Sequence, residues 1–224
     1  VENLRVSAAI NEEVLGEVVA MVCEGTSFRK LFEHYRQGVA ARGAELRLWA
    51  SGHGTASAAS FEPSDTLIRS GDLVFLDMGC AYHGYMSDMC RVFSMGEPSR
   101  RALQCYQAIM KGYRTALDLI KPGAMASTIF QRALEAVRGS GLPNFRRHHL
   151  GHSIGLENHE PPIIGSSESL LAFQDYPLEE GMVLAIEIPY YELGTGGINV
   201  EDMILVTGDG WEYITAMSRE LLVL

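Results

Sequence analysis

The chain has 224 residues, of which 47% are hydrophobic and 21% charged, and its formal net charge at pH 7 is −10. This composition is typical of a globular protein with a substantial core and argues against disorder. The acidic balance and the lack of a Lys/Arg cluster argue against a nucleic-acid partner. No apolar run reaches the roughly 18 residues of a membrane span. No secretory signal opens the chain, so we expect a cytoplasmic protein without a membrane partner.

Four cysteines give no indication of a metal site or a redox motif. Cys23, Cys80, Cys90 and Cys105 contain no CxxC pair and match no zinc spacing. We interpret them as free thiols of a reducing compartment. Their spacing leaves disulfides open as the alternative.

Periodic apolar positions and Gly/Pro stops predict four helices in two pairs. They are expected at about residues 4–22, 27–41, 99–120 and 126–139. Runs with the composition of strands separate and follow the helix pairs. These strands are expected at residues 46–51, 73–79, 85–95, 148–150, 182–190, 198–207 and 211–215. Strands 73–79 and 85–95 are expected to form a hairpin, whereas 56–61 and 165–171 are expected to be loops.

Each half of the chain has the same order of elements, two helices followed by strands. The segment Gly25–Phe32 also matches Gly123–Phe130, with a glycine and an apolar pair at the same offset. We therefore expect an α+β fold whose two similar halves place helices over an antiparallel sheet. No linker interrupts the chain, so residues 1–224 are expected to form one domain.

Three acidic residues lie next to uninterrupted apolar, strand-like runs, where acids are unexpected: Asp77, Glu187 and Glu201. A lone buried carboxylate costs several kcal/mol unless a positive charge compensates it. Few Lys or Arg residues are nearby in the sequence, so a shared metal ion, or a pair of ions, is the simplest explanation. Asp88, on the second strand of the predicted hairpin, gives each half two carboxylates.

Four histidines within twelve residues offer nitrogen ligands: His148, His149, His152 and His159. Glycines near His152 indicate a strand and loop that approach another group closely. One imidazole with four carboxylates makes an oxygen-rich site, which favours Mn²⁺, Fe²⁺ or Co²⁺ and leaves Zn²⁺ open. Carboxylates of this kind can bridge two ions about 3.5–4 Å apart.

These residues resemble the motifs of the pita-bread metallopeptidases, the family of methionine aminopeptidase, prolidase, aminopeptidase P and creatinase. The resemblance covers essentially the whole chain, and the stretch around Glu201 is most similar to the Xaa-Pro peptidase branch. The matching segments are Leu76–Gly79, Ser87–Arg91, Gly151–Gly155, His159–Pro161, Glu187–Pro189 and Gly196–Thr207. The resemblance implies a pita-bread fold, with two pseudo-twofold-related halves around a curved antiparallel sheet.

The resemblance also implies roles for individual residues. The implied metal ligands are Asp77, Asp88, His152, Glu187 and Glu201, with Asp88 and Glu201 in bridging positions. The implied ions are two divalent cations, with Mn²⁺ favoured over Co²⁺, Fe²⁺ and Zn²⁺. The implied catalytic residues are His148 and His159, which would contact the substrate and its oxyanion, and Glu187, the proton shuttle for the nucleophilic water.

Two positions depart from the Xaa-Pro branch. Ser60 stands where that branch places a substrate-facing histidine, and Asn199 stands where it usually has an arginine. His53, seven residues before Ser60, is either an ordinary loop residue or a relocated substitute. These departures leave the implied metal ligands intact but remove groups that help to hold a prolyl peptide.

The resemblance favours a dinuclear hydrolase of the Xaa-Pro dipeptidase or aminopeptidase type, which cleaves a small peptide or peptide-like amide with a metal-bridged hydroxide. A homodimer is expected from the family alone. The alternative is a metal-dependent hydrolase or lyase acting on a non-peptide small molecule, as creatinase, ectoine hydrolase and dimethylsulfoniopropionate lyase do. A non-catalytic binding module is the third interpretation, although such modules typically lose metal ligands. The N-terminal domain of larger members is expected to be absent or trimmed, since the chain begins within the first helix.

Overall fold

The computed structural model describes residues 1–54, 56–166 and 174–224 and contains the four expected helices. The helices are α1 (Glu2–Ala20), α2 (Phe28–Ala41), α3 (Arg100–Leu119) and α4 (Ala126–Gly139). Ser27 and Ser99 cap the N-termini of α2 and α3, because their hydroxyls accept hydrogen bonds from backbone N–H groups of the first turn. In the part of the chain that is described, no helix is long and apolar enough to cross a membrane.

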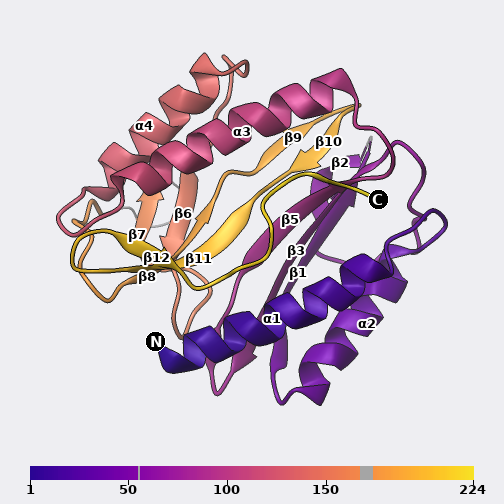
Figure 1. The fold of residues 1–224 in the computed structure, drawn as a ribbon, viewed down its shortest axis with the longest axis horizontal. Helices are drawn as coiled ribbons and strands as arrows, with labels where there is room; N and C mark the ends of the chain where they lie inside the picture. Colours follow the sequence, from indigo (N-terminus) through magenta and orange to yellow (C-terminus); the bar gives the residue numbers. More distant parts are fainter. Residues whose placement is uncertain (55, 167–173) are drawn as a thin grey trace.

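The strands form a curved sheet that lies between the two helix pairs (Figure 1). The main strands are β1 (Glu45–His53), β2 (Ala56–Ser60), β3 (Leu73–Tyr82), β5 (Met89–Ser94), β6 (His149–Ser153), β7 (Glu160–Gly165), β8 (Val183–Glu187) and β11 (Glu201–Val206). The short ones are β4 (Tyr85–Met86), β9 (Tyr190–Glu192), β10 (Gly196–Ile198), β12 (Trp211–Tyr213) and β13 (Leu222–Val223).

The main path through the sheet is antiparallel and runs β2-β1-β3-β5-β11-β8-β6-β7. β5 of the first half meets β11 of the second half at its centre, and β13 adds a short parallel pair to β5. The expected α+β arrangement, two helix-helix-strand halves around a curved antiparallel sheet, is confirmed.

The first helix pair covers one face of β3. Val74, Leu76 and Met78 are fully buried in the hydrophobic cluster that also contains the core residues of α1 and α2. Because side chains alternate along a strand, Asp77 lies on the opposite face. The packing that holds this half together therefore directs Asp77 away from its helices.

The second helix pair covers one face of β8 and β11 in the same way. Leu184, Ile186 and Ile204 are fully buried in the cluster that also contains the apolar faces of α3 and α4. Glu187 and Glu201 occupy the alternate positions of their strands and face away from these helices. Both halves thus direct acidic side chains onto the inner face of the curved sheet.

Three strands lie where the sequence predicted none: β2, β7 and β13. β2 occupies most of the 56–61 segment that is expected to be a loop, and β7 contains the Pro161-Pro162 pair, although proline is uncommon within strands. The expected strand 85–95 is interrupted by Ser87 and Asp88. Of the loop expected at 165–171, residues 167–171 lie outside the described residues. All four cysteines are free, as predicted.

Candidate metal centre

A row of side chains crosses the inner face of the sheet from one half to the other. Glu187 of β8 is directly opposite Glu201 of β11, and Glu201 is opposite Cys90 of β5. Cys90 is in turn opposite Asp77 of β3. Directly opposed residues of antiparallel strands share a face, so the strand register alone gathers three of the five predicted metal ligands.

The other two predicted ligands complete this row. Asp88 precedes β5 and is 2% exposed, and His152 of β6 is 1% exposed. The His152 Nε2 atom lies 3.9 Å from Asp88 Oδ2 and 3.7 Å from Glu201 Oε1. Asp88, His152 and Glu201 therefore offer ligand atoms close enough to share one ion.

An irregularity of β6 aims His152 at the centre. Its register against β7 shifts between His149 and His152, so β6 carries one extra residue there. Gly151 has a φ of +146°, and a Cβ at this position would lie 2.6 Å from the Ala185 carbonyl oxygen. Only glycine fits. The extra residue places His149 and His152, three apart in sequence, on the same inner face.

Without a cation between them, the clustered carboxylates repel one another. Burial, together with the charges of Asp88 and Glu187, raises the pKa of Asp77 well above its usual value. Burial and the charge of Glu187 raise the pKa of Asp88 to about 7, even though Asn158 donates a hydrogen bond to it. Burial and the charges of four neighbouring acids, Asp88, Glu187, Asp77 and Asp202, likewise raise the pKa of Glu201. A cation among them would remove this cost.

Enclosed atoms without partners show where such a cation fits. They are Asp77 Oδ1, Asp88 Oδ1, His152 Nε2 and Glu201 Oε1, one atom from each of four predicted ligands. Buried polar atoms are nearly always hydrogen-bonded, so four orphans in one cluster indicate a group that satisfies them together. Four carboxylates, which bind through oxygen, and one imidazole suit a hard divalent ion.

His152 has the protonation state of a metal ligand. Its Nδ1 lies 3.1 Å from the Ser153 carbonyl oxygen, which is an acceptor only, so Nδ1 carries the proton. Burial, with the charge of His159, lowers the pKa of His152 to about 4 and keeps the ring neutral at pH 7. The Nε2 lone pair is therefore directed at the carboxylates, in the arrangement that ligating histidines usually show.

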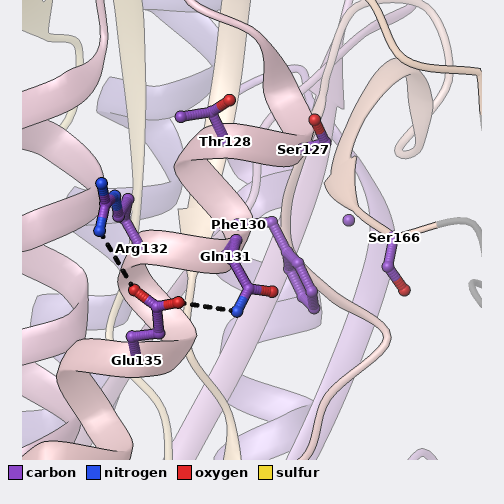
Figure 2. A pocket seen from close by; sticks show the side chains of 8 residues that line it. Ser127, Thr128, Phe130, Gln131, Arg132, Glu135 and Ser166 are labelled. Atoms are coloured by element: carbon purple, nitrogen blue, oxygen red, sulfur yellow. Dashed lines mark hydrogen bonds and ion pairs between the residues drawn. The ribbon is translucent and has the colours of Figure 1, made fainter.

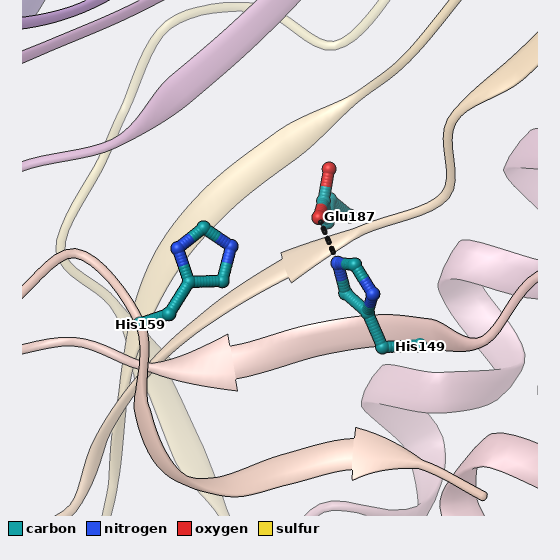
Figure 3. Close-up of side chains that lie close together, drawn as sticks. All are labelled: His149, His159 and Glu187. Atoms are coloured by element: carbon teal, nitrogen blue, oxygen red, sulfur yellow. Dashed lines mark hydrogen bonds and ion pairs between the residues drawn. The ribbon is translucent and has the colours of Figure 1, made fainter. Parts of the chain in front are cut away.

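Glu187 accepts hydrogen bonds from two side chains, one of which, His149, is drawn in Figure 3. His149 Nε2 lies 2.9 Å from Oε1, and Asn199 Nδ2 donates to Oε2 at 3.1 Å. Burial alone would raise the pKa of Glu187, but the hydrogen bond from His149 and the electrostatic influence of His149, His152 and Arg147 lower it to about 2. Glu187 is thus ionised and fixed in orientation, and its pKa is shifted in the opposite direction from those of Asp77, Asp88 and Glu201.

Of the two other predicted catalytic residues, His159 lies beside the candidate ligands and His148 lies farther out. His159 stacks on His152 with ring centroids 3.8 Å apart and is within ligand distance of His149 and Glu187. His148 contacts the His149 ring and lines a surface hollow with Arg146 and Arg147. It is in neither group of candidate metal ligands among the described residues.

The two positions that depart from the Xaa-Pro branch, Ser60 and Asn199, lie in different surroundings. Ser60 is exposed on β2, where its hydroxyl donates to the Glu62 carbonyl oxygen. His53 is opposite Val74 on the helix-covered face of the sheet and packs against Phe28, so it does not substitute for the missing histidine. Asn199, in contrast, is 1% exposed and takes part in the site through Glu187.

Sequence reasoning gave no role to three residues that the structure places here: His149, Asn158 and Asn199. His149 was visible only as one member of a histidine run. Asn158 directly precedes His159, and Asn199 lies two residues before Glu201. An amide side chain next to a predicted site residue is the pattern that could have indicated both.

A buried ion pair supports the row from the helix side. Asp202, next to Glu201, is fully buried and accepts hydrogen bonds from Arg91, Arg219, Tyr113 and Thr215. Arg91 also donates to the Glu201 carbonyl oxygen at 2.6 Å. This pair fixes β11 against β5, and with it the position of Glu201.

The surface hollow over α4 lacks the features of a catalytic site (Figure 2). It has a volume of about 630 Å³ and is lined by Ser127, Thr128, Phe130, Gln131, Arg132, Glu135, Gly165 and Ser166. Its one acid, Glu135, is exposed and bonded to Gln131 and Arg132. The chemistry therefore belongs to the inner face of the sheet.

The sequence and the fold have counterparts among known proteins. The model of a family described as metallopeptidase family M24 matches residues 2–208. The dipeptidase PepE from Mycobacterium ulcerans superposes with a TM-score of 0.90 at 30% identity, over 99% of this chain and 59% of that chain. An X-Pro aminopeptidase from Thermotoga maritima gives a TM-score of 0.90 at 28% identity, over 100% of this chain and 62% of that chain. The prolidase from Pyrococcus furiosus gives 0.89 at 28% identity, over 97% and 64%.

The curated relatives are longer than this chain. An uncharacterised peptidase of Staphylococcus aureus (strain MSSA476) is 31% identical over 225 residues, which cover 96% of this chain and 60% of that protein. The chain thus spans about 60% of the length of the curated relatives it matches.

Proposed function

The chain belongs to metallopeptidase family M24, and on this premise we propose that it is a hydrolase that uses two divalent metal ions to cleave a small peptide. We propose Asp77, Asp88, His152, Glu187 and Glu201 as the ligands, and Mn²⁺ as the preferred ion. The observation that carries the proposal is the set of four orphaned ligand atoms, one on each of four of these residues. The preference for Mn²⁺ rests on the excess of oxygen donors.

The ions, when bound, would supply an activated water and polarise the scissile carbonyl. The residues of the chain would do the rest. Glu187, ionised and held by His149 and Asn199, is suited to accept a proton from a water on the inner face and to pass it to the leaving amine. His159 is exposed at the edge of the centre, where it can donate a hydrogen bond to a substrate oxygen. We keep His148 as a proposed substrate contact from the family resemblance.

The proposed substrate is an Xaa-Pro dipeptide or a short peptide with proline in the second position. This choice rests on the resemblance to the Xaa-Pro branch and on the superposition with an X-Pro aminopeptidase and a prolidase. We also propose that the protein acts as a homodimer in the cytoplasm, on family grounds. Analytical ultracentrifugation tests the dimer: a single species of twice 24.6 kDa supports it, and a monomer contradicts it.

A non-peptide substrate is the second candidate. Asn199 is the specific observation, since it replaces the expected arginine and presents a buried Oδ1 atom without a partner. An acceptor at this place suits a substrate that donates a hydrogen bond and lacks the anionic group an arginine would bind.

A substrate panel decides between the candidates. The protein reconstituted with Mn²⁺ is assayed against Xaa-Pro dipeptides, longer Xaa-Pro peptides and small amides, with a chelated sample as the blank. We expect release of the N-terminal residue, at least about 100-fold slower for Glu187→Gln, since its proton acceptor is lost. Glu179→Gln is the matched control because Glu179 is exposed just before β8, and it should keep full activity. Turnover of a non-peptide compound alone supports the second candidate, and no turnover with metal bound refutes both.

A further inference from the structure

A second group of ligand atoms lies beside the proposed dinuclear centre (Figure 3). His149 of β6, His159 before β7 and Glu187 of β8 offer ligand atoms that all lie within 4.8 Å of one another. This group has two nitrogen donors and one oxygen donor. The Asp88, His152 and Glu201 group has the opposite composition.

We infer that His149, His159 and Glu187 form an additional cation site, selective for Zn²⁺, whose occupation stops the proposed reaction. The site is adjacent to the proposed dinuclear centre. Its two histidines are not among the ligands of that centre. It shares only Glu187, whose two oxygens are bonded to different partners, His149 and Asn199.

The geometry of the three residues suits zinc. Two histidines and one glutamate form a known zinc donor set, with the fourth position left to water. Bonds of about 2.0–2.1 Å in a tetrahedral site place the ligand atoms roughly 3.3 Å apart. His149 Nε2 and Glu187 Oε1 are already 2.9 Å apart. His159 is exposed, so its ring can close the remaining gap at little cost.

The two sites differ in the ion they prefer. Nitrogen donors raise affinity along the series from Mn²⁺ to Zn²⁺, whereas a carboxylate-rich site discriminates less. At low concentration, added Zn²⁺ is therefore expected to enter the histidine group before it displaces Mn²⁺ from the carboxylates. When Nε2 binds a metal, the ring proton must lie on Nδ1, which is buried and has no partner in the protein, so this unpaired N–H weakens the binding of zinc.

Occupation of this site removes groups that the proposed reaction needs. Zinc would bind the Glu187 oxygen that faces His149 and would fix the His159 ring away from a substrate oxygen. This consequence rests on the proposed function, but zinc binding itself does not. The test therefore measures metal content first and activity second.

The binding experiment starts from protein loaded with Mn²⁺, which is titrated with Zn²⁺, freed of unbound metal and analysed for both elements. We expect one equivalent of zinc in addition to the full manganese content. His149→Asn should lose this equivalent and keep its manganese. His148→Asn is the matched control, since His148 is adjacent but outside the group, and it should bind zinc as the unchanged protein does. Zinc that enters only by displacing manganese overturns the inference.

A second measurement is independent of the variants. Crystals of the unchanged protein, soaked with Mn²⁺ and then with Zn²⁺, are measured on both sides of the zinc absorption edge. We expect a zinc peak within about 2.0–2.1 Å of His149 Nε2. No peak there overturns the inference, even if His149→Asn fails to fold. In the activity assay, the zinc concentration for half inhibition should rise at least about tenfold in His149→Asn. An inactive protein that still binds the extra zinc refutes the proposed function and leaves the site.

Discussion

The interaction of Arg91 with Asp202 is the part of the structure whose loss has the clearest predicted cost. Arg91 is 2% exposed and uses all five of its N–H donors. One goes to Asp202 and the other four go to backbone carbonyls of Cys90, Glu201, Met217 and Ser218. These contacts tie β5, β11 and the C-terminal segment together.

The magnitude follows from what remains when Arg91 is replaced by methionine. Breaking a buried ion pair typically costs about 3–5 kcal/mol. Asp202 keeps the guanidinium of Arg219 and the hydroxyls of Tyr113 and Thr215, so its charge is still compensated. Four carbonyl oxygens lose their donor. We therefore expect Arg91→Met to lower the free energy of unfolding by about 3 kcal/mol, the low end of that range.

Urea unfolding and thermal melts measure this change. For a chain of this size, about 3 kcal/mol corresponds to a fall in Tm of roughly 6–12 °C. Arg132→Met is the control because its pair with Glu135 is exposed and 3.4 Å long, and it should change stability by less than about 0.5 kcal/mol. If Arg91→Met costs no more than Arg132→Met, the reasoning about the buried pair is wrong.

Four further predictions concern the rest of the molecule. Chelation should lower the Tm, because the clustered carboxylates lose their cation, and added Mn²⁺ should restore it; an unchanged Tm in scanning calorimetry contradicts this. Gly16→Ala should stabilise α1 by about 0.5–1 kcal/mol, since nothing lies within 4 Å of the new Cβ. Gly112→Ala should destabilise, since its Cβ would lie 2.3 Å from Val137. The hydrogen bonds from Arg101 lower the pKa of Glu192 to about 2; Glu192→Gln should therefore cost about 1 kcal/mol at pH 7, discounted for partial exposure, and progressively less as the pH falls below about 4.5.

The acids were the most informative part of the sequence. Asp77, Glu187 and Glu201 stand among apolar strand residues, where a buried carboxylate is costly unless it has a function. The strand registers then bring them together, because each occupies the position that alternates away from its helix-covered neighbours. Fold and candidate ligands were predictable for the same reason: period-two alternation decides both the core and the polar face.

The histidines show where sequence patterns are insufficient. His148 and His152 are four residues apart, and residues an even number apart lie on the same face of a regular strand. The extra residue at Gly151 reverses this, so that His149 shares the inner face with His152. A bulge of one residue cannot be located from residue types alone. β2 was missed for a different reason, since its Ala and Ser residues have no strand preference.

Anomalous diffraction from crystals soaked with Mn²⁺ alone tests the central claim most directly. The account predicts two manganese peaks on the inner face of the sheet, about 3.5–4 Å apart, with Asp88 and Glu201 touching both and Asp77, His152 and Glu187 completing the set. A map with no peak there, or with manganese bound elsewhere, contradicts the account.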